Sequence, residues 1–272
     1  MSDGPDPGID AIDGQGAETC PVTRARGRVA EELERTREKH RALDRFESTV
    51  ESIAVASPTR QVSTEGFAAA QSAGSTGVRQ VREAFEEHVR PLSGDALETP
   101  ETAHEAIATE FSRDVAVALA TAESGGLPSR LKRAVLDESA RRRGEMKLTA
   151  RALDGERESL DGARETLDGV RSWLDDRDDV RLSTRDFGTL VAWHDRLDDH
   201  RTALDGVAER RQRYLDRTTA ADVTVAVSHR TLVEYLYAES PTTFPVLDAC
   251  ASLAGACTTA RRNVREHLTT RA

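Results

Sequence analysis

A leucine recurs every seven residues through one long stretch of this chain, and this repeat restricts the fold more than any other feature. The segments LDGERES, LDGARET, LDGVRSW and LDDRDDV follow one another without a gap. A seven-residue apolar period is typical of helices that pair along a narrow seam. The sequence therefore predicts a long helix from about residue 128 to 174. Its seam leucines are Leu153, Leu160, Leu167 and Leu174.

The positions beside these leucines are poor in apolar residues. Four residues after the first three leucines stand Arg157, Arg164 and Arg171, which predicts a partly wet seam lined by arginine stems. A glycine two residues after each of these leucines costs about 1 kcal/mol relative to alanine inside a helix. The helix must therefore be stabilised by a partner helix. Glu156 and Glu158 are interpreted as ordinary exposed acids.

A second helix with the same period follows a short acidic segment. DDRDD (175–179) is typical of a turn, and Ser183 is a candidate N-cap for a helix that extends to about residue 217. Two long apolar stripes joined by a short turn predict an antiparallel, coiled-coil-like helical hairpin over residues 127–217. The seam leucines of the returning helix are Leu190, Leu197 and Leu204.

Helical stripes and breaker residues divide the remainder of the chain, and the predicted fold class is all-α. Ser57-Pro58 ends the first long helix. The expected divisions are a disordered leader (1–20), an N-terminal long helix (21–56), a linker (57–76), short helices (77–126), the hairpin (127–217) and C-terminal helices (218–272).

The short helices and the C-terminal helices contain several large apolar side chains, and we expect them to pack together as a small helical head. Burial of aromatic rings would supply much of its stability. The predicted head core consists of Phe85, Phe111, Tyr235, Tyr237, Phe244, Val246 and Leu247.

Composition limits both the fold and the surroundings of the chain. Only 38% of residues are hydrophobic and 4% aromatic, too few for a doubly wound sheet with apolar strands. Acidic residues outnumber basic ones by 48 to 38, and only three of the basic residues are lysines. This bias is typical of proteins adapted to molar salt, where the Debye length is about 3 Å. We expect a halophilic cytoplasm, because no signal peptide or membrane span is evident.

No motif in the sequence predicts a reaction centre. In WHDRLDDH, His194 and Asp198 share a helical face, but His200 is rotated away, so a solvated acidic face is favoured over a metal site. The acidic segment 175–179 lacks the calcium-loop pattern, and phosphate-binding and nucleophile motifs do not occur. Cys250 and Cys257 are two helical turns apart and are interpreted as small buried apolar residues. We predict no catalytic residue, cofactor or metal ligand.

The function favoured by these patterns is a non-enzymatic scaffold or protein-interaction protein, and self-association through an exposed seam is one form that the interaction would take. The alternative is a DNA-associated regulator that uses a helix-turn-helix-like segment (228–270) with a turn near Gly255 and Arg261 on its last helix. An apolar stripe that continues from Val246 to Leu268 favours one uninterrupted helix instead. Acids interleave the basic cluster 141–143, so nucleic acid is the less favoured partner, and no membrane is expected.

Three stretches resemble a haloarchaeal protein family of unknown function whose members are predicted to be helical. They are VRQVREAFEEHV (78–89), ETAHEAIATEFSRDVAVAL (101–119) and LVEYLYAESPTTFPVL (232–247). The resemblance covers most of residues 22–268 and implies a helical fold. It implies no activity, ligand or catalytic residue. Family members have more aromatic residues where this chain has PLSGDALETP (91–100).

Overall fold

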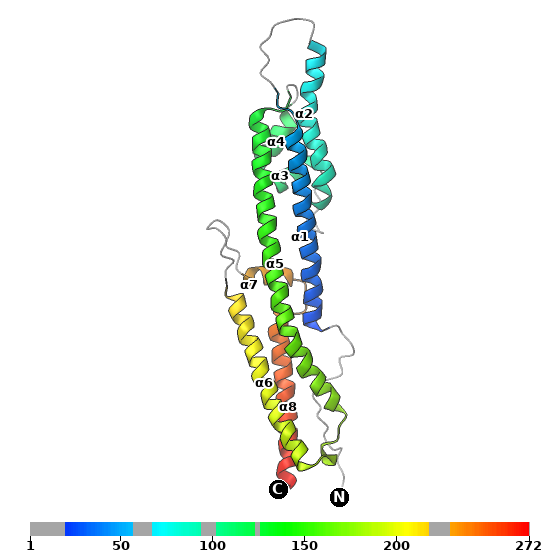
Figure 1. Ribbon diagram of the computed structural model, residues 1–272, viewed down its shortest axis with the longest axis vertical. Coiled ribbons are helices and arrows are strands. Elements are labelled where there is room, and N and C mark those ends of the chain that lie inside the picture. Colours follow the sequence, from blue (N-terminus) through cyan, green and yellow to red (C-terminus); the bar gives the residue numbers. More distant parts are fainter. Residues whose placement is uncertain (1–19, 57–66, 94–101, 123–125, 218–228, 272) are drawn as a thin grey trace. The chain divides into compact units, whose positions relative to one another are not determined.

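The described part of the chain is helical. The structure, a computed structural model, describes residues 20–56, 67–93, 102–122, 126–217 and 229–271 (Figure 1). Within these ranges the sole β-type pairing is an isolated parallel bridge between Val55 and Leu127. The all-α fold class is therefore confirmed for these residues. The predicted leader, apart from Cys20, lies outside them.

The described residues form helices, of which α5 and α1 are the longest. The α-helices are α1 (Pro21–Ser52), α2 (Phe67–His88), α3 (Ala103–Glu110), α4 (Arg113–Thr121), α5 (Ser129–Asp178), α6 (Phe187–Leu215), α7 (His229–Leu236) and α8 (Pro245–Arg271), with 3-10 helices η1 (Arg90–Leu92) and η2 (Leu182–Thr184). Helix α2 begins at Phe67, within the segment predicted to be a linker.

Side-chain caps fix where several helices begin. Thr102 and Glu105 form a reciprocal capping box at α3, and Ser112 accepts a hydrogen bond from Val115 N at α4. Helix α6 is capped by Asp186, whose Oδ1 accepts from the backbone N–H of Thr189 at 2.9 Å. The prediction of Ser183 as this cap is wrong, because Ser183 lies within η2.

Contacts divide the chain into two units, each of which takes part of α1 and part of α5. Unit 1 contains residues up to Glu31 and from Ala152 onwards, and unit 2 contains Glu32–Arg151. Phe85 and Phe111 therefore lie in unit 2, whereas the other five residues of the predicted head core lie in unit 1. The apolar faces of α1 and α5 are long enough to pack with different partners along their length.

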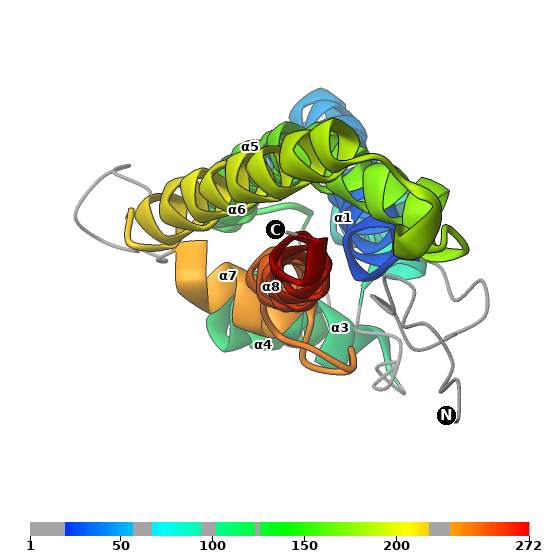
Figure 2. The ribbon, with the colours of Figure 1, turned by 90° about the horizontal axis from the view of Figure 1, so that it is seen from below.

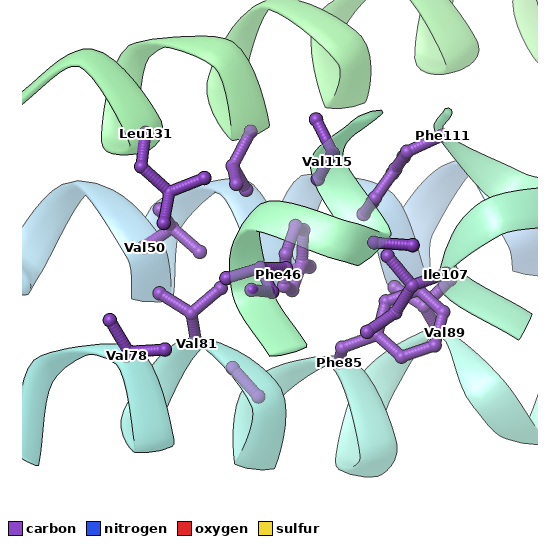
Figure 3. Close-up of a cluster of buried hydrophobic side chains, with 14 of the residues drawn as sticks. Phe46, Val50, Val78, Val81, Phe85, Val89, Ile107, Phe111, Val115 and Leu131 are labelled. Atoms are coloured by element: carbon purple, nitrogen blue, oxygen red, sulfur yellow. The ribbon is translucent and has the colours of Figure 1, made fainter. Parts of the chain in front are cut away.

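Unit 2 has a core built around three phenylalanines from successive helices (Figure 3). The Phe46 and Phe111 rings stack with centroids 5.4 Å apart, and Phe85 meets them edge-on at 6.1 and 5.6 Å. Such edge-to-face contacts add to the free energy gained from burial. The remaining core side chains are small or medium aliphatics from α1 to α5 and from the segments that flank these helices.

Basic side chains satisfy the backbone carbonyls where helices of unit 2 end. Lys132 Nζ donates to the carbonyls of Glu51 and Ile53, at 2.7 Å each, at the end of α1. Arg141 donates to the carbonyl of Phe111 at the end of α3, and Arg82 donates to that of Leu119 in α4. The last carbonyls of a helix have no partner within the helix and carry partial negative charge, so a cation there is stabilising.

Unit 1 packs α6 against α8 (Figure 2). Arg261 of α8 connects the two helices: its Nε donates to His194 Nε2 at 3.2 Å, and its Nη1 lies 2.8 Å from Asp198 Oδ1. Helix α8 runs from Pro245 to Arg271 without a break at Gly255. The alternative with a turn near Gly255 is therefore wrong, and the continuous apolar stripe is the reason.

A close approach of two segments in unit 2 favours glycine at position 77. A Cβ built on Gly77 would lie 3.1 Å from both Cβ and N of Leu127. Leu127 is held in place by the bridge to Val55 and by the hydrogen bond from Ala56 N to its carbonyl, at 2.9 Å. The backbone of Leu127 therefore has little freedom to move away.

We predict opposite effects of alanine at two helical glycines of unit 2. Gly77→Ala should lower the free energy of unfolding by about 1–3 kcal/mol, because it overpacks against Leu127. Gly144→Ala, where a Cβ meets nothing within 4 Å, should raise it by about 0.5–1 kcal/mol. Denaturant unfolding in molar KCl measures both. Equal stabilisation by the two variants would contradict the close approach.

Candidate functional site

The most buried ionic group of unit 1 is a carboxylate–guanidinium pair between α5 and α6. Glu156 is 0% exposed and Arg211 is 2% exposed. Arg211 Nη1 donates to Glu156 Oε2 and Nη2 donates to Oε1, both at 2.8 Å. This is the bidentate geometry that the planar guanidinium fork favours.

Two hydroxyl groups add hydrogen bonds to this pair, while Arg211 Nε is buried without a partner among the described residues. Tyr237, which follows α7, donates its hydroxyl to Glu156 Oε1 at 2.8 Å. Ser159 Oγ accepts from Arg211 Nη1, also at 2.8 Å. The buried carboxylate therefore accepts three hydrogen bonds, which largely replace the water that it loses on burial.

Aromatic rings cover the pair on one side. The Arg211 guanidinium lies 5.1 Å from the centroid of the Tyr214 ring, which in turn lies 4.4 Å from that of His229. Burial raises the pKa of the Tyr214 and Tyr237 hydroxyls, and the negative charge of Glu156 raises them further. Burial also lowers the pKa of His229, which Glu156 opposes. Both tyrosines therefore stay protonated at neutral pH, and this favours a structural role for the cluster.

The interpretation of Glu156 as an exposed acid is wrong, because the second row of buried positions was misplaced. The positions three residues after the seam leucines hold Glu156, Ala163 and Val170, all at most 5% exposed. The arginines four residues after the leucines are half-buried or exposed. In a seven-residue repeat, the second buried row can lie either three or four residues after each leucine. The apolar residues Ala163 and Val170 were the signal that it lies three residues after.

All the predicted seam leucines are buried. Leu153, Leu160, Leu167, Leu174, Leu190, Leu197 and Leu204 are each at most 3% exposed.

The unit 1 residues of the predicted head core differ in their exposure. Tyr237 and Val246 are buried, and Phe244 and Leu247 are half-buried. Tyr235 is 60% exposed, so its predicted burial is wrong. The reason is local: α7 is short, and its inward face is already taken by Val233 and Leu236.

Unit 2 contains its own buried carboxylate. Glu110 is 1% exposed, and its Oε1 lies 2.5 Å from Lys39 Nζ while its Oε2 accepts from Arg142 Nε at 3.2 Å. Arg141 pairs with Glu138 and Glu145, and Arg143 pairs with Asp44 and Glu47. The basic cluster 141–143 is therefore used in ion pairs within unit 2.

Both tryptophans of the chain lie together where α5 and α6 approach their connecting turn. The Trp173 and Trp193 centroids are 6.2 Å apart, and Arg177 lies 4.1 and 5.3 Å from them. His200 contacts Trp173 with centroids 5.2 Å apart and is 7% exposed. Burial lowers the pKa of His200, and the cations Arg196 and Arg177 lower it further, which Asp199 opposes.

The metal-ligand candidates, a small hollow and the cysteines of the described residues were compared with what a reaction centre needs. Among the residues that the structure describes, no group of three or more His, Cys, Asp or Glu side chains is placed to hold a metal ion. A hollow of about 40 Å³ is lined by residues that include Pro21, Tyr237 and Pro245. Burial raises the pKa of the Cys250 and Cys257 thiols to about 11. No helix in the described ranges is long and apolar enough to cross a membrane.

Comparison with known proteins identifies a family but no activity. The chain matches the model of a domain of unknown function, DUF7260, over residues 20–261. The chain belongs to this family. No curated protein and no solved structure matches it. The match agrees with the resemblance to a family of unknown function, whereas a haloarchaeal origin stays a prediction.

We predict that removing one partner of the buried pair is far more costly than removing an exposed arginine. Arg211→Ala should lower the free energy of unfolding by about 3–5 kcal/mol, because it leaves Glu156 buried without a counter-charge. Arg164→Ala, which breaks an exposed pair with Asp168, should cost at most about 1 kcal/mol. Denaturant titrations compare the two variants, and similar losses would argue against the buried pair.

We also predict that unit 1 loses stability in mild acid. Because the pKa of His200 is below 6.5 in the folded chain, the unfolded chain binds more protons once the pH falls below about 6.5. Stability should therefore fall as the pH decreases through that range. His200→Gln should reduce this slope, and adding His229→Gln should reduce it further, as measured by unfolding at a series of pH values. An unchanged slope in the double variant would contradict this assignment.

Proposed function

We propose that this chain is a non-enzymatic helical scaffold that associates with a second copy of itself in a halophilic cytoplasm. The observation that carries the proposal is that the buried carboxylates are already paired with other side chains of the protein. Glu156 and Glu110 are each enclosed by cations or hydroxyls of the same unit. A general acid or base needs an accessible group with a pKa near the working pH, and these carboxylates are inaccessible.

The contacts between α5 and α6 support an antiparallel rod as the scaffold. Glu156 pairs with Arg211, and farther along α5 Trp173 meets Trp193, which lies earlier on α6. Two helices whose contacts run in opposite chain directions form a hairpin, and seven-residue spacing favours coiled-coil packing. This rod would present its surface, rather than a cavity, to partners.

An apolar surface at the start of α6 supports self-association. The tip surface, named here for its place at the start of α6, consists of Phe187 and Val191. Phe187 is 54% exposed and Val191, one turn later, is 37% exposed. Molar salt screens charge contacts, so a partner surface of the same apolar kind is favoured, as in a two-fold dimer.

Two observations in unit 1 argue against the DNA-associated alternative. Its turn near Gly255 is replaced by continuous helix, and Arg261 is used in contacts with His194 and Asp198.

Light scattering in molar KCl tests the proposal. The parent protein should show a concentration-dependent mass that reaches a dimer. Phe187→Asp should weaken the association at least about tenfold, which corresponds to about 1.4 kcal/mol, because it places a charge in an apolar contact. Val117→Asp, at a residue of unit 2 that is 47% exposed, is the matched control and should dimerise like the parent. A parent protein that stays monomeric at high concentration would refute self-association.

A further inference from the structure

The apolar seam of the α5–α6 pair does not by itself determine which residues face each other. Leucines recur at seven-residue intervals on both helices, and all seven are buried. If α5 slid along α6 by seven residues, leucine rows would again face apolar rows. Register is weakly specified wherever an apolar pattern repeats itself.

The turn between the helices would also permit such a slide. Only residues 179–186 separate α5 from α6. Because the helices run in opposite directions, a seven-residue slide lengthens one helix by about one turn and shortens the other by the same amount. No additional residues are needed, so chain connectivity does not prevent the slide.

The buried polar layer is one of two places where the repeat is broken, the other being the Trp173–Trp193 contact near the turn. Position 156 is glutamate, whereas the equivalent positions seven and fourteen residues later are Ala163 and Val170. On α6, Arg211 follows Leu204 at the same seven-residue interval. In the observed register Glu156 receives both Nη groups of Arg211 and the hydroxyl of Tyr237. After a slide in one direction Arg211 would face Ala163, and after a slide in the other direction Glu156 would face Leu204. Either slide separates the two ionic groups and places one of them against an apolar side chain, which is strongly unfavourable.

We propose that Glu156, Arg211 and Tyr237 form a register lock that selects one alignment of α5 on α6. The apolar rows supply most of the burial, and the polar layer makes the shifted alignments unfavourable. Tyr237 extends the lock beyond the hairpin, because it brings the segment after α7 to the same carboxylate. This inference does not depend on self-association through the tip surface.

Distances between spin labels on α5 and α6 test the lock in the full-length protein. Labels attached through a keto-bearing amino acid at exposed positions 165 and 192 leave the native cysteines unchanged. The parent should give one distance. Glu156→Leu with Arg211→Leu and Tyr237→Phe should fold but give two distances, because alignments one heptad apart differ by about 10 Å along the axis. Leu204→Met, which leaves the lock intact, should give one distance.

A second variant moves the lock instead of removing it. Glu156→Ala with Ala163→Glu places the carboxylate one heptad later, so Arg211 should recruit it and the single distance should shift. The proposal is overturned if the apolar triple variant keeps only the parental distance, or if the relocated carboxylate leaves the distance unchanged. Failure of the apolar variant to fold also overturns it, because a lock that only selects register is dispensable for folding.

Discussion

Pairing of buried carboxylates with cations is the constraint on which the rest of this structure depends. Each unit encloses one carboxylate, Glu156 or Glu110, that is at most 1% exposed. A buried carboxylate is tolerated only where cations and hydrogen-bond donors replace its hydration. In both units the donors come from helices far apart in sequence, so satisfying the carboxylate also determines which helices must meet. The apolar contacts, with only 38% hydrophobic residues available, are less selective.

Arginine and lysine have different parts in this arrangement. Arg211 uses its planar fork to bind both oxygens of one carboxylate, and Arg177 lies over two tryptophan rings. Lysine, a compact point charge, is used where one nitrogen must serve a carboxylate or two carbonyls, as at Lys39 and Lys132. Salt screens buried pairs much less than exposed ones. These contacts therefore depend less on salt than the exposed ion pairs do.

Local sequence patterns predicted the positions of the long helices well. They did not predict the burial of a side chain whose partner lies on another helix. Heptad leucines and breaker residues predicted the extents of α5 and α6 closely, because both signals are contained in the helix itself. Glu156 was misread because its burial depends on Arg211 and Tyr237, which no local pattern reveals. The predicted head failed for a related reason: apolar faces show that Phe85 and Tyr237 are inside, but not that they belong to different units.

The same dependence on distant partners explains why a repetitive sequence can still have one structure. In a seam of leucines every heptad is equivalent, so several alignments of the two helices gain almost the same free energy from apolar burial. One polar layer removes this equivalence, because a buried charge is stabilised by its own partner and strongly destabilised by any apolar neighbour. Glu156 thus contributes specificity out of proportion to its net effect on stability. A chain in which 32% of residues are charged and 4% are aromatic can specify a helical pair with such charges where large apolar side chains are few.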